Sequence, residues 1–247
     1  MMGAWQKMIW TEIKLFIREP LALFFIVVFP LLLLLVFGGI YGNAPNEAFN
    51  GLGAVDVLVP GYVGLVIATS GLLSLPIALA TYRESGTLRR YQAAPISPLI
   101  LLAAHVIVNL LASLIGVVLV IIAGRIIYDL QLPDFPFALG LVFVLSSLAI
   151  YTVGFIIGGT VSSSRVAQAI GNVLLFPMLF LSGAALPQEL LPDLMHDISR
   201  ALPLTYIVDG LQAAWYGGGL DLLALNVLIG LLAPGTLIAA RTFRWQT

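Results

Sequence analysis

Six long apolar segments constrain this chain more than any other feature of its sequence. They cover about residues 21–41, 57–81, 99–122, 137–160, 166–186 and 222–240. A helix needs about 20 mainly apolar residues to cross a hydrocarbon core of about 30 Å. Charged residues make up 9% of the 247 residues, whereas soluble domains carry about 25%. The sequence therefore predicts an all-α membrane protein with six transmembrane helices, in a single transmembrane domain over residues 1–247.

The residues before the first apolar segment predict a helix on the membrane surface. Within residues 4–19, one helical face carries apolar and aromatic side chains, namely Trp5, Ile9, Ile13 and Phe16. Another face carries Lys7, Lys14 and Arg18. A helix of this kind lies in the plane of the interface, and Pro20 ends it because the residue before a proline disfavours helical geometry. Anchoring to the membrane and a position beside a partner protein are both compatible with this pattern.

The fifth apolar segment is interrupted, and it predicts broken helices between the fifth and sixth spans. Pro177, Ser182 and Gly183 lie within or at the end of this segment. The semi-apolar stretch 204–216 that follows is too short to cross a bilayer alone, because crossing takes about 20 residues. We expect residues 183–216 to form re-entrant half-helices that enter the outer leaflet.

The positions of the basic residues orient the predicted spans. With six crossings, both termini lie on one side of the membrane, and nine of the 11 Lys and Arg residues lie on that side. Only Arg125 and Arg200 lie on the opposite side. Because Lys and Arg concentrate in cytoplasmic loops, we expect both termini to be cytoplasmic. The predicted location is the cytoplasmic membrane of a prokaryote.

The polar loop between the second and third spans, residues 82–98, is unusual in so apolar a chain. Its sequence is YRESGTLRRYQAAPISP, and the charge distribution places it in the cytoplasm. One interpretation is a contact surface for a partner that supplies energy. The other is an ordinary basic loop that obeys the positive-inside rule, and these residues alone leave both open.

The third span carries a polar face formed by His105, Asn109 and Ser113, which recur every four residues. Polar residues inside spans are candidates for a transport path or a proton site. They also form hydrogen bonds between helices, each worth about 1 kcal/mol, and we favour this second interpretation. No acidic residue lies in the middle of a predicted span, which argues against a carrier driven by protons.

Several kinds of chemistry are disfavoured by residue content. The chain has no cysteine and two histidines far apart in sequence, so thiol chemistry and a metal site are not expected. The phosphate-binding pattern G-x-x-x-x-G-K-[ST] is missing, since both lysines precede the first span. A serine protease built on Ser182 and His196 is not favoured, because no G-x-S-G motif surrounds a serine. We expect no enzyme activity and no nucleic-acid partner.

Three groups of residues follow one another along the chain. They are Arg18-Glu19-Pro20, the sequence RESGTL at 83–88 with APISP at 94–98, and LSGAALP at 181–187 with LPLTYIVDG at 202–210. In this order they resemble the permease subunits of type 2 ABC exporters, the family that includes daunorubicin-type drug-efflux permeases. The second group resembles the Glu-Arg-Glu-x-Gly-Thr-Leu pattern of that family. Tyr82 stands where the pattern has an acidic residue.

The resemblance implies that residues 82–98 form a coupling helix that docks on an ABC ATPase subunit. The positions that match the family pattern, and so are expected to contact the ATPase, are Glu84, Gly86, Thr87 and Leu88. ATP and Mg²⁺ would bind to that partner, and this chain would hold no cofactor. Two permeases, identical or sister subunits, would face each other in membrane lipid and export amphipathic drugs or lipids. An ATP-independent carrier or channel is the alternative.

Overall fold

The computed structural model describes residues 4–49, 51–87, 98–185, 188 and 191–242, and these residues form helices without any strand. Six helical stretches are long and apolar enough to cross a membrane. They are Pro20–Tyr41, Ala54–Glu84, Ile100–Tyr128, Pro136–Thr160, Ser164–Leu181 and Leu222–Thr242. The predicted all-α fold with six membrane-spanning helices is confirmed.

Several of these stretches are built from more than one helical element. An N-terminal helix, α1 (Ala4–Ile17), precedes the first span, which comprises α2 (Pro20–Leu23), the π-helical turn η1 (Phe24–Val28) and α3 (Phe29–Tyr41). The second span comprises α4 (Ala54–Thr69), the π-helical turn η3 (Ser70–Ser74) and α5 (Leu75–Glu84). The remaining elements are η2 (Glu47–Phe49), α7 (Pro98–Tyr128), α8 (Pro136–Thr160), α9 (Ser164–Leu181), α10 (Asp193–Ser199), α11 (Pro203–Trp215) and α12 (Leu222–Thr242).

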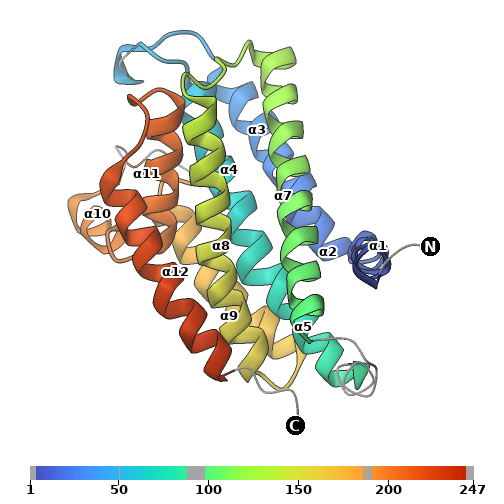
Figure 1. The fold of residues 1–247 in the computed structure, drawn as a ribbon. Coiled ribbons are helices and arrows are strands. Elements are labelled where there is room, and N and C mark those ends of the chain that lie inside the picture. Colours follow the sequence, from blue (N-terminus) through green and yellow to red (C-terminus); the bar gives the residue numbers. More distant parts are fainter. Residues whose placement is uncertain (1–3, 50, 88–97, 186–187, 189–190, 243–247) are drawn as a thin grey trace.

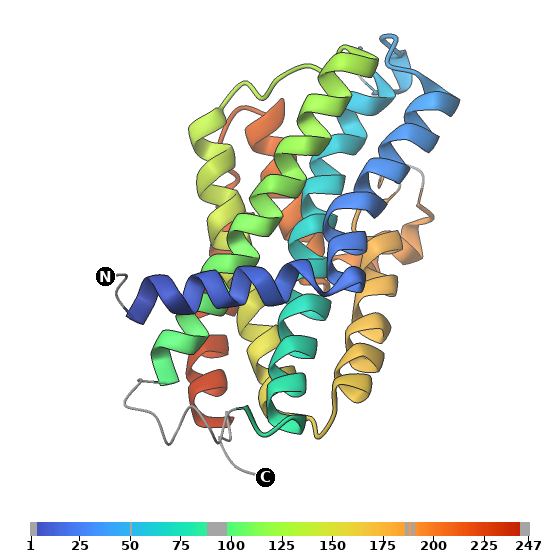
Figure 2. The ribbon, with the colours of Figure 1, turned by 90° about the vertical axis from the view of Figure 1, so that its right-hand side faces the viewer.

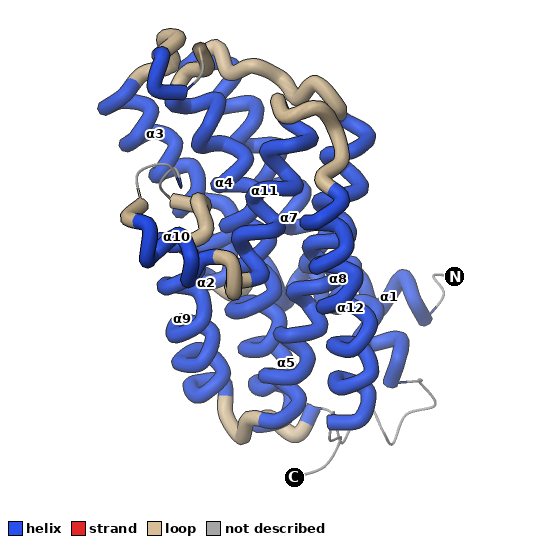
Figure 3. The backbone as a smooth tube through the Cα atoms, turned by 90° about the vertical axis from the view of Figure 1, so that its left-hand side faces the viewer, coloured by secondary structure: helices blue, strands red, loops and turns tan. Residues whose placement is uncertain are grey.

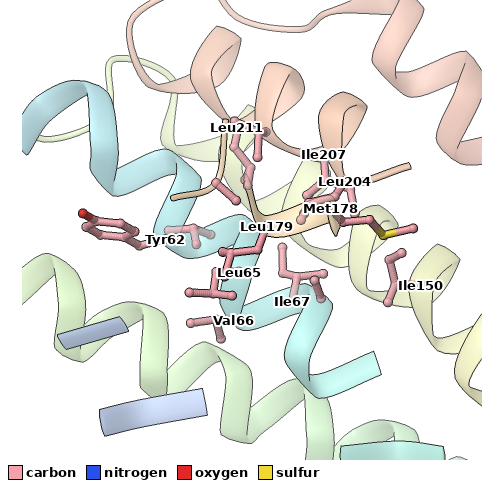
Figure 4. Close-up of a cluster of buried hydrophobic side chains, with 14 of the residues drawn as sticks. Tyr62, Leu65, Val66, Ile67, Ile150, Met178, Leu179, Leu204, Ile207 and Leu211 are labelled. Atoms are coloured by element: carbon pink, nitrogen blue, oxygen red, sulfur yellow. The ribbon is translucent and has the colours of Figure 1, made fainter. Parts of the chain in front are cut away.

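The second span forms the centre of the bundle (Figure 1). In its apolar stretch 94% of the residues are buried, against 22% in the first span. Figure 4 shows how Leu65 and Ile67 of α4 lie among side chains from α8, α9 and α11. A helix that is apolar on all sides is a buried helix. Movement of this span therefore requires movement of its neighbours.

The helix α1 lies crosswise to the spans and packs against α7 (Figure 2). Met8 and Glu12 on this side of α1 are buried, whereas Trp10 and Ile17 are exposed. The chain then turns into the first span at Pro20, the first residue of α2. This geometry agrees with an amphipathic helix that lies along a surface.

The half-helices expected between the fifth and sixth spans are α10 and α11 (Figure 3). Helix α9 ends at Leu181, earlier than residue 186, because Gly183 has a φ of 78° that helices do not contain. Near the start of α11, the Thr205 hydroxyl donates a hydrogen bond to Ser182 Oγ over 3.0 Å. At the other end of α11, the Asp134 amide donates to the Trp215 carbonyl. Ser182 thus serves helix packing, and α11 reaches the turn before α8.

Each π-helical turn is followed by a proline, Pro30 or Pro76. A proline lacks an amide donor and crowds the carbonyl four residues earlier, and one π turn accommodates this break. Pro76 crowds the carbonyl of Leu72, which lies within η3. This carbonyl faces a glycine on a neighbouring helix, Gly171 of α9. In the same way Ile26 O lies against Gly116, where an added Cβ would come within 2.5 Å of it. These glycines allow the second span to approach the fifth, and the first span to approach the third, closely.

Candidate functional site

The described beginning of the polar loop is anchored to the turn between α8 and α9. The Arg83 guanidinium donates hydrogen bonds to the carbonyls of Gly159 and Val161, over 2.7 and 2.8 Å. The Ser164 hydroxyl donates to Glu84 Oε2 over 2.8 Å. These bonds connect the end of the second span to the start of the fifth. We call this end of the bundle the Glu84 end.

The other predicted contact residues follow directly after α5. Gly86 has a φ of 68°, a value that side chains with a Cβ disfavour, and its amide donates to the Arg83 carbonyl over 3.1 Å. The Thr87 and Ser85 hydroxyls are hydrogen-bonded over 2.7 Å. The chain therefore leaves α5 through a defined turn. Leu88 and the rest of the loop up to residue 97 lie outside the described residues.

A buried polar cluster lies close to this turn, and we call Glu12, Tyr82 and His105 the Glu12 cluster. The Tyr82 hydroxyl donates to Glu12 Oε2 over 2.8 Å. His105 Nδ1 lies 3.4 Å from the same oxygen. Glu12 is 2% exposed and His105 is 3% exposed. Three elements, α1, α5 and α7, thus meet at one carboxyl group.

Further polar contacts continue from the Glu12 cluster into the bundle. The Asn109 side-chain amide donates to the His105 carbonyl over 3.0 Å, and Ser70 Oγ donates to Asn109 Oδ1 over 3.3 Å. Ser70 Oγ is also 3.1 Å from the Tyr151 hydroxyl on α8. Ser113 is buried as well. The polar face predicted on the third span therefore faces other helices.

The sequence reasoning did not identify Glu12 or Tyr82 as members of a site. Glu12 lies on the apolar side of α1, with Met8 and Leu15. An acidic residue on an apolar helix face indicates a buried polar contact, so the sequence did contain a signal for this site. Tyr82 is the position at which the loop departs from the family pattern. The structure shows that its hydroxyl contacts an acid from α1, so the acidic partner of His105 comes from outside the spans.

Burial raises the pKa of Glu12 from 4.5 to about 7, and the hydrogen bond from Tyr82 opposes part of this effect. The negative charge of Glu19 raises the pKa of Glu12 further. Burial also raises the pKa of Glu19 itself from 4.5 to about 7. Two carboxyl groups near the start of the first span therefore change charge close to neutral pH.

The Glu12→Gln variant is expected to gain thermal stability relative to the unchanged chain as pH rises. The ionised form of Glu12 is disfavoured in the folded protein. The contribution of Glu12 to the free energy of unfolding therefore decreases as the pH rises from 4.5 to about 7. The difference amounts to about 3–4 kcal/mol at most, since one pKa unit corresponds to about 1.4 kcal/mol. Melting temperatures of the detergent-solubilised proteins at pH 4.5 and pH 8 test this. An equal difference at both pH values would contradict a raised pKa.

Two grooves flank the junction of α1 with the first span. One, of about 260 Å³, lies between the first and second spans, with Arg18 and Glu19 beside Phe25, Leu73 and Ile77. The other, of about 280 Å³, is lined entirely by apolar or small residues of α1, the first span and α7, including Phe16 and Leu111. The first groove combines a basic and an acidic side chain with an apolar wall. That combination suits molecules with one polar and one apolar part.

The six apolar spans and the crosswise helix define a multi-pass membrane protein. The ABC-2 type transporter family matches this chain over residues 3–216. The chain belongs to the ABC-2 type transporter family and is a transport permease. Membership in this family implies an ABC ATPase partner.

Individual relatives agree with this assignment. A protein of Pyropia yezoensis named as a transport permease, ycf38, is 29% identical over 199 residues, which are 78% of this chain and 67% of that protein. YvfS of Bacillus subtilis, also named as a transport permease, is 24% identical and covers 88% of this chain and 87% of its own length. The inner membrane transport permease YhhJ of Escherichia coli is 28% identical over 70% of this chain and 46% of its own length.

Proposed function

We propose that this permease is the membrane subunit of an ATP-driven exporter of amphipathic small molecules or lipids. Residues 82–98 would transmit the closure of a separate ABC ATPase to the spans. The observation that carries this proposal is the double anchoring of Arg83 and Glu84 to the α8–α9 turn. A force applied to the loop would therefore act on the second, fourth and fifth spans together, as a rigid-body motion requires.

The proposal includes a topology and an assembly. Both termini and the Glu84 end would face the cytoplasm in the cytoplasmic membrane, as the distribution of Lys and Arg favours. ATP and Mg²⁺ would bind to the ATPase, and this chain would bind neither. Two permeases, identical or sister subunits, would enclose the path within membrane lipid. The groove of about 260 Å³ between the first and second spans supports a cargo with both polar and apolar parts.

Co-purification with the cognate ABC ATPase tests the coupling role of the loop. The double variant Glu84→Ala, Leu88→Ala is expected to recover about tenfold less ATPase, or to hydrolyse ATP without transport. Removal of Glu84 frees the Ser164 hydroxyl, and Leu88 matches the family position for docking. Arg200→Ala is the control, because Arg200 contacts Asp197 over 3.9 Å in an exposed ion pair at α10, and such pairs contribute little.

Two outcomes would contradict the proposal. Unchanged recovery and unchanged transport in the double variant would remove the coupling role of Glu84 and Leu88. Transport by the purified permease alone, driven by a proton gradient without any ATPase, would instead support the ATP-independent carrier. The substrate assay can use a fluorescent phospholipid analogue as the amphipathic probe.

A further inference from the structure

We propose that Glu12 is a positioning residue for transport, through which movement of the polar loop reaches the first span. By contacting Tyr82 and His105, Glu12 joins α1 to both helices that flank residues 82–98. The inference rests on the proposed coupling role of that loop. It adds α1 and the first span to the parts that the ATPase moves.

The position of the Glu12 cluster relative to the loop is the first argument. Tyr82 lies two residues before Glu84 at the end of α5, and His105 lies in the first turns of α7, which begins at Pro98. The Glu12 carboxyl group contacts both, at 2.8 and 3.4 Å. A movement of these two helix ends would therefore also displace the carboxyl group and α1.

The packing around this carboxyl group is the second argument. Met8, Tyr82, Leu101 and Ala104 form a buried hydrophobic cluster separate from the main core of the bundle. The rings of Tyr82 and His105 lie 5.1 Å apart. The three helix segments therefore share a small core of their own. Close-packed interiors transmit displacement, so this region is expected to move as one body.

The connection from α1 to the first span is the third argument. Only Arg18 and Glu19 separate the two helices, and their amides donate to the Leu15 and Phe16 carbonyls over 3.0 Å. The Leu23 amide in turn donates to the Glu19 carbonyl over 3.1 Å. This hydrogen-bonded corner contains no flexible linker. A displacement of α1 is therefore passed to the start of the first span.

The space around the first span is the fourth argument. Grooves of about 260 and 280 Å³ flank its beginning, one toward the second span and one toward α7. Its π-helical turn η1 comes within the first half of the span, and such turns occur often at functional sites. The first span therefore has room to move against the second. Its movement would open or close the groove that we propose for the cargo.

A single introduced cysteine can report this movement, because the chain has no cysteine of its own. Phe25→Cys places a thiol in the groove between the first and second spans. In the complex with its ABC ATPase in proteoliposomes, we compare its reaction rate with a water-soluble maleimide, without nucleotide and with ATP plus vanadate. A change of about fivefold or more is expected for the otherwise unchanged permease.

Four further variants in this background separate positioning from folding. Glu12→Ala and Tyr82→Phe are expected to reduce the nucleotide-dependent change to less than twofold while the complex still contains its ATPase. Tyr82→Phe keeps the ring and its packing, so this variant tests the hydrogen bond even if Glu12→Ala fails to fold. Glu12→Gln keeps a carbonyl oxygen that accepts from Tyr82 and is expected to restore the change. Lys14→Ala, on the exposed side of α1, is the control and is expected to behave as the unchanged permease.

The result that overturns the inference is a full nucleotide-dependent change in both Glu12→Ala and Tyr82→Phe. That result is distinguishable from failure of the proposed function. If the loop does not couple to an ATPase, the permease with Glu12 and Tyr82 intact will itself recover no ATPase or show no nucleotide-dependent change.

Discussion

Replacing Gly154 by alanine is expected to destabilise the helix bundle by about 1–3 kcal/mol, the usual cost of an extra group in a packed core. Gly154 lies on α8 opposite η3, and an added Cβ would collide with the Gly71 carbonyl. Backbone cannot move aside as a flexible side chain can, so the fourth span would have to shift away from the second. Because the second span is the centre of the bundle, leucine at this position is expected to prevent stable folding.

Gly140 provides a matched control on the same helix. An added Cβ at Gly140 meets no atom within 4 Å, so Gly140→Ala is expected to be neutral or slightly stabilising, since alanine favours helices over glycine. Thermal unfolding of the detergent-solubilised proteins measures both changes. Equal melting temperatures for Gly154→Ala and Gly140→Ala would show that the close contact with Gly71 does not limit packing.

Replacing Asp56 by alanine is expected to destabilise the opposite end of the bundle by roughly 3–5 kcal/mol. Asp56 is 2% exposed and accepts hydrogen bonds from the Gly53 amide at 3.2 Å, the Asn43 side-chain amide at 3.1 Å and the Gln131 amide at 2.8 Å. Alanine would leave the Gly53 and Gln131 amides without this acceptor, and each buried unpaired group costs about 1–3 kcal/mol. The Asn43 amide would keep only its bond to the Tyr128 carbonyl. The loops before the second span and after the third would separate.

Graded substitutions at this end make the prediction specific. Asp56→Asn keeps one oxygen and is expected to lose about half as much stability as Asp56→Ala, because an amide cannot replace both carboxylate oxygens. Asp129→Asn is the control: Asp129 is exposed and pairs with Arg125 over 2.8 Å, and exposed ion pairs contribute about 0–1 kcal/mol. Asparagine also tolerates the φ of 54° at this position. Melting temperatures are expected to fall by about 10 °C for Asp56→Ala. A fall no larger than that of Asp129→Asn would contradict this role.

The spans themselves could be predicted from the sequence because crossing a bilayer is a local requirement. Each span needs enough consecutive apolar residues and must satisfy its own backbone hydrogen bonds, and both properties are visible in about 20 residues. The broken helices after the fifth span were visible for the same reason, since Gly183 and the nearby prolines act locally. The order of the motifs was also sufficient to suggest the permease family.

The Glu12 cluster could not be predicted in this way. In sequence, Glu12 on α1 is 70 residues away from Tyr82 on α5. His105 lies still farther along the chain, on α7. Nothing local in a helix at the membrane surface specifies which span its one buried acid will contact. Apolar spans carry few polar groups, so their hydropathy alone does not determine how they rotate against one another.

The sequence by itself therefore determined that this chain has six helices able to cross a membrane, where its charged loop lies along the chain, and which family it resembles. Only the tertiary structure decided which residues meet across helices: Glu12 with Tyr82 and His105, Asp56 with Gln131, and Gly154 with Gly71. The physical reason is the distance along the chain over which each property is determined. Insertion into a bilayer depends on the composition of each segment, whereas helix packing depends on close contacts between small residues and hydrogen bonds that join distant parts of the chain.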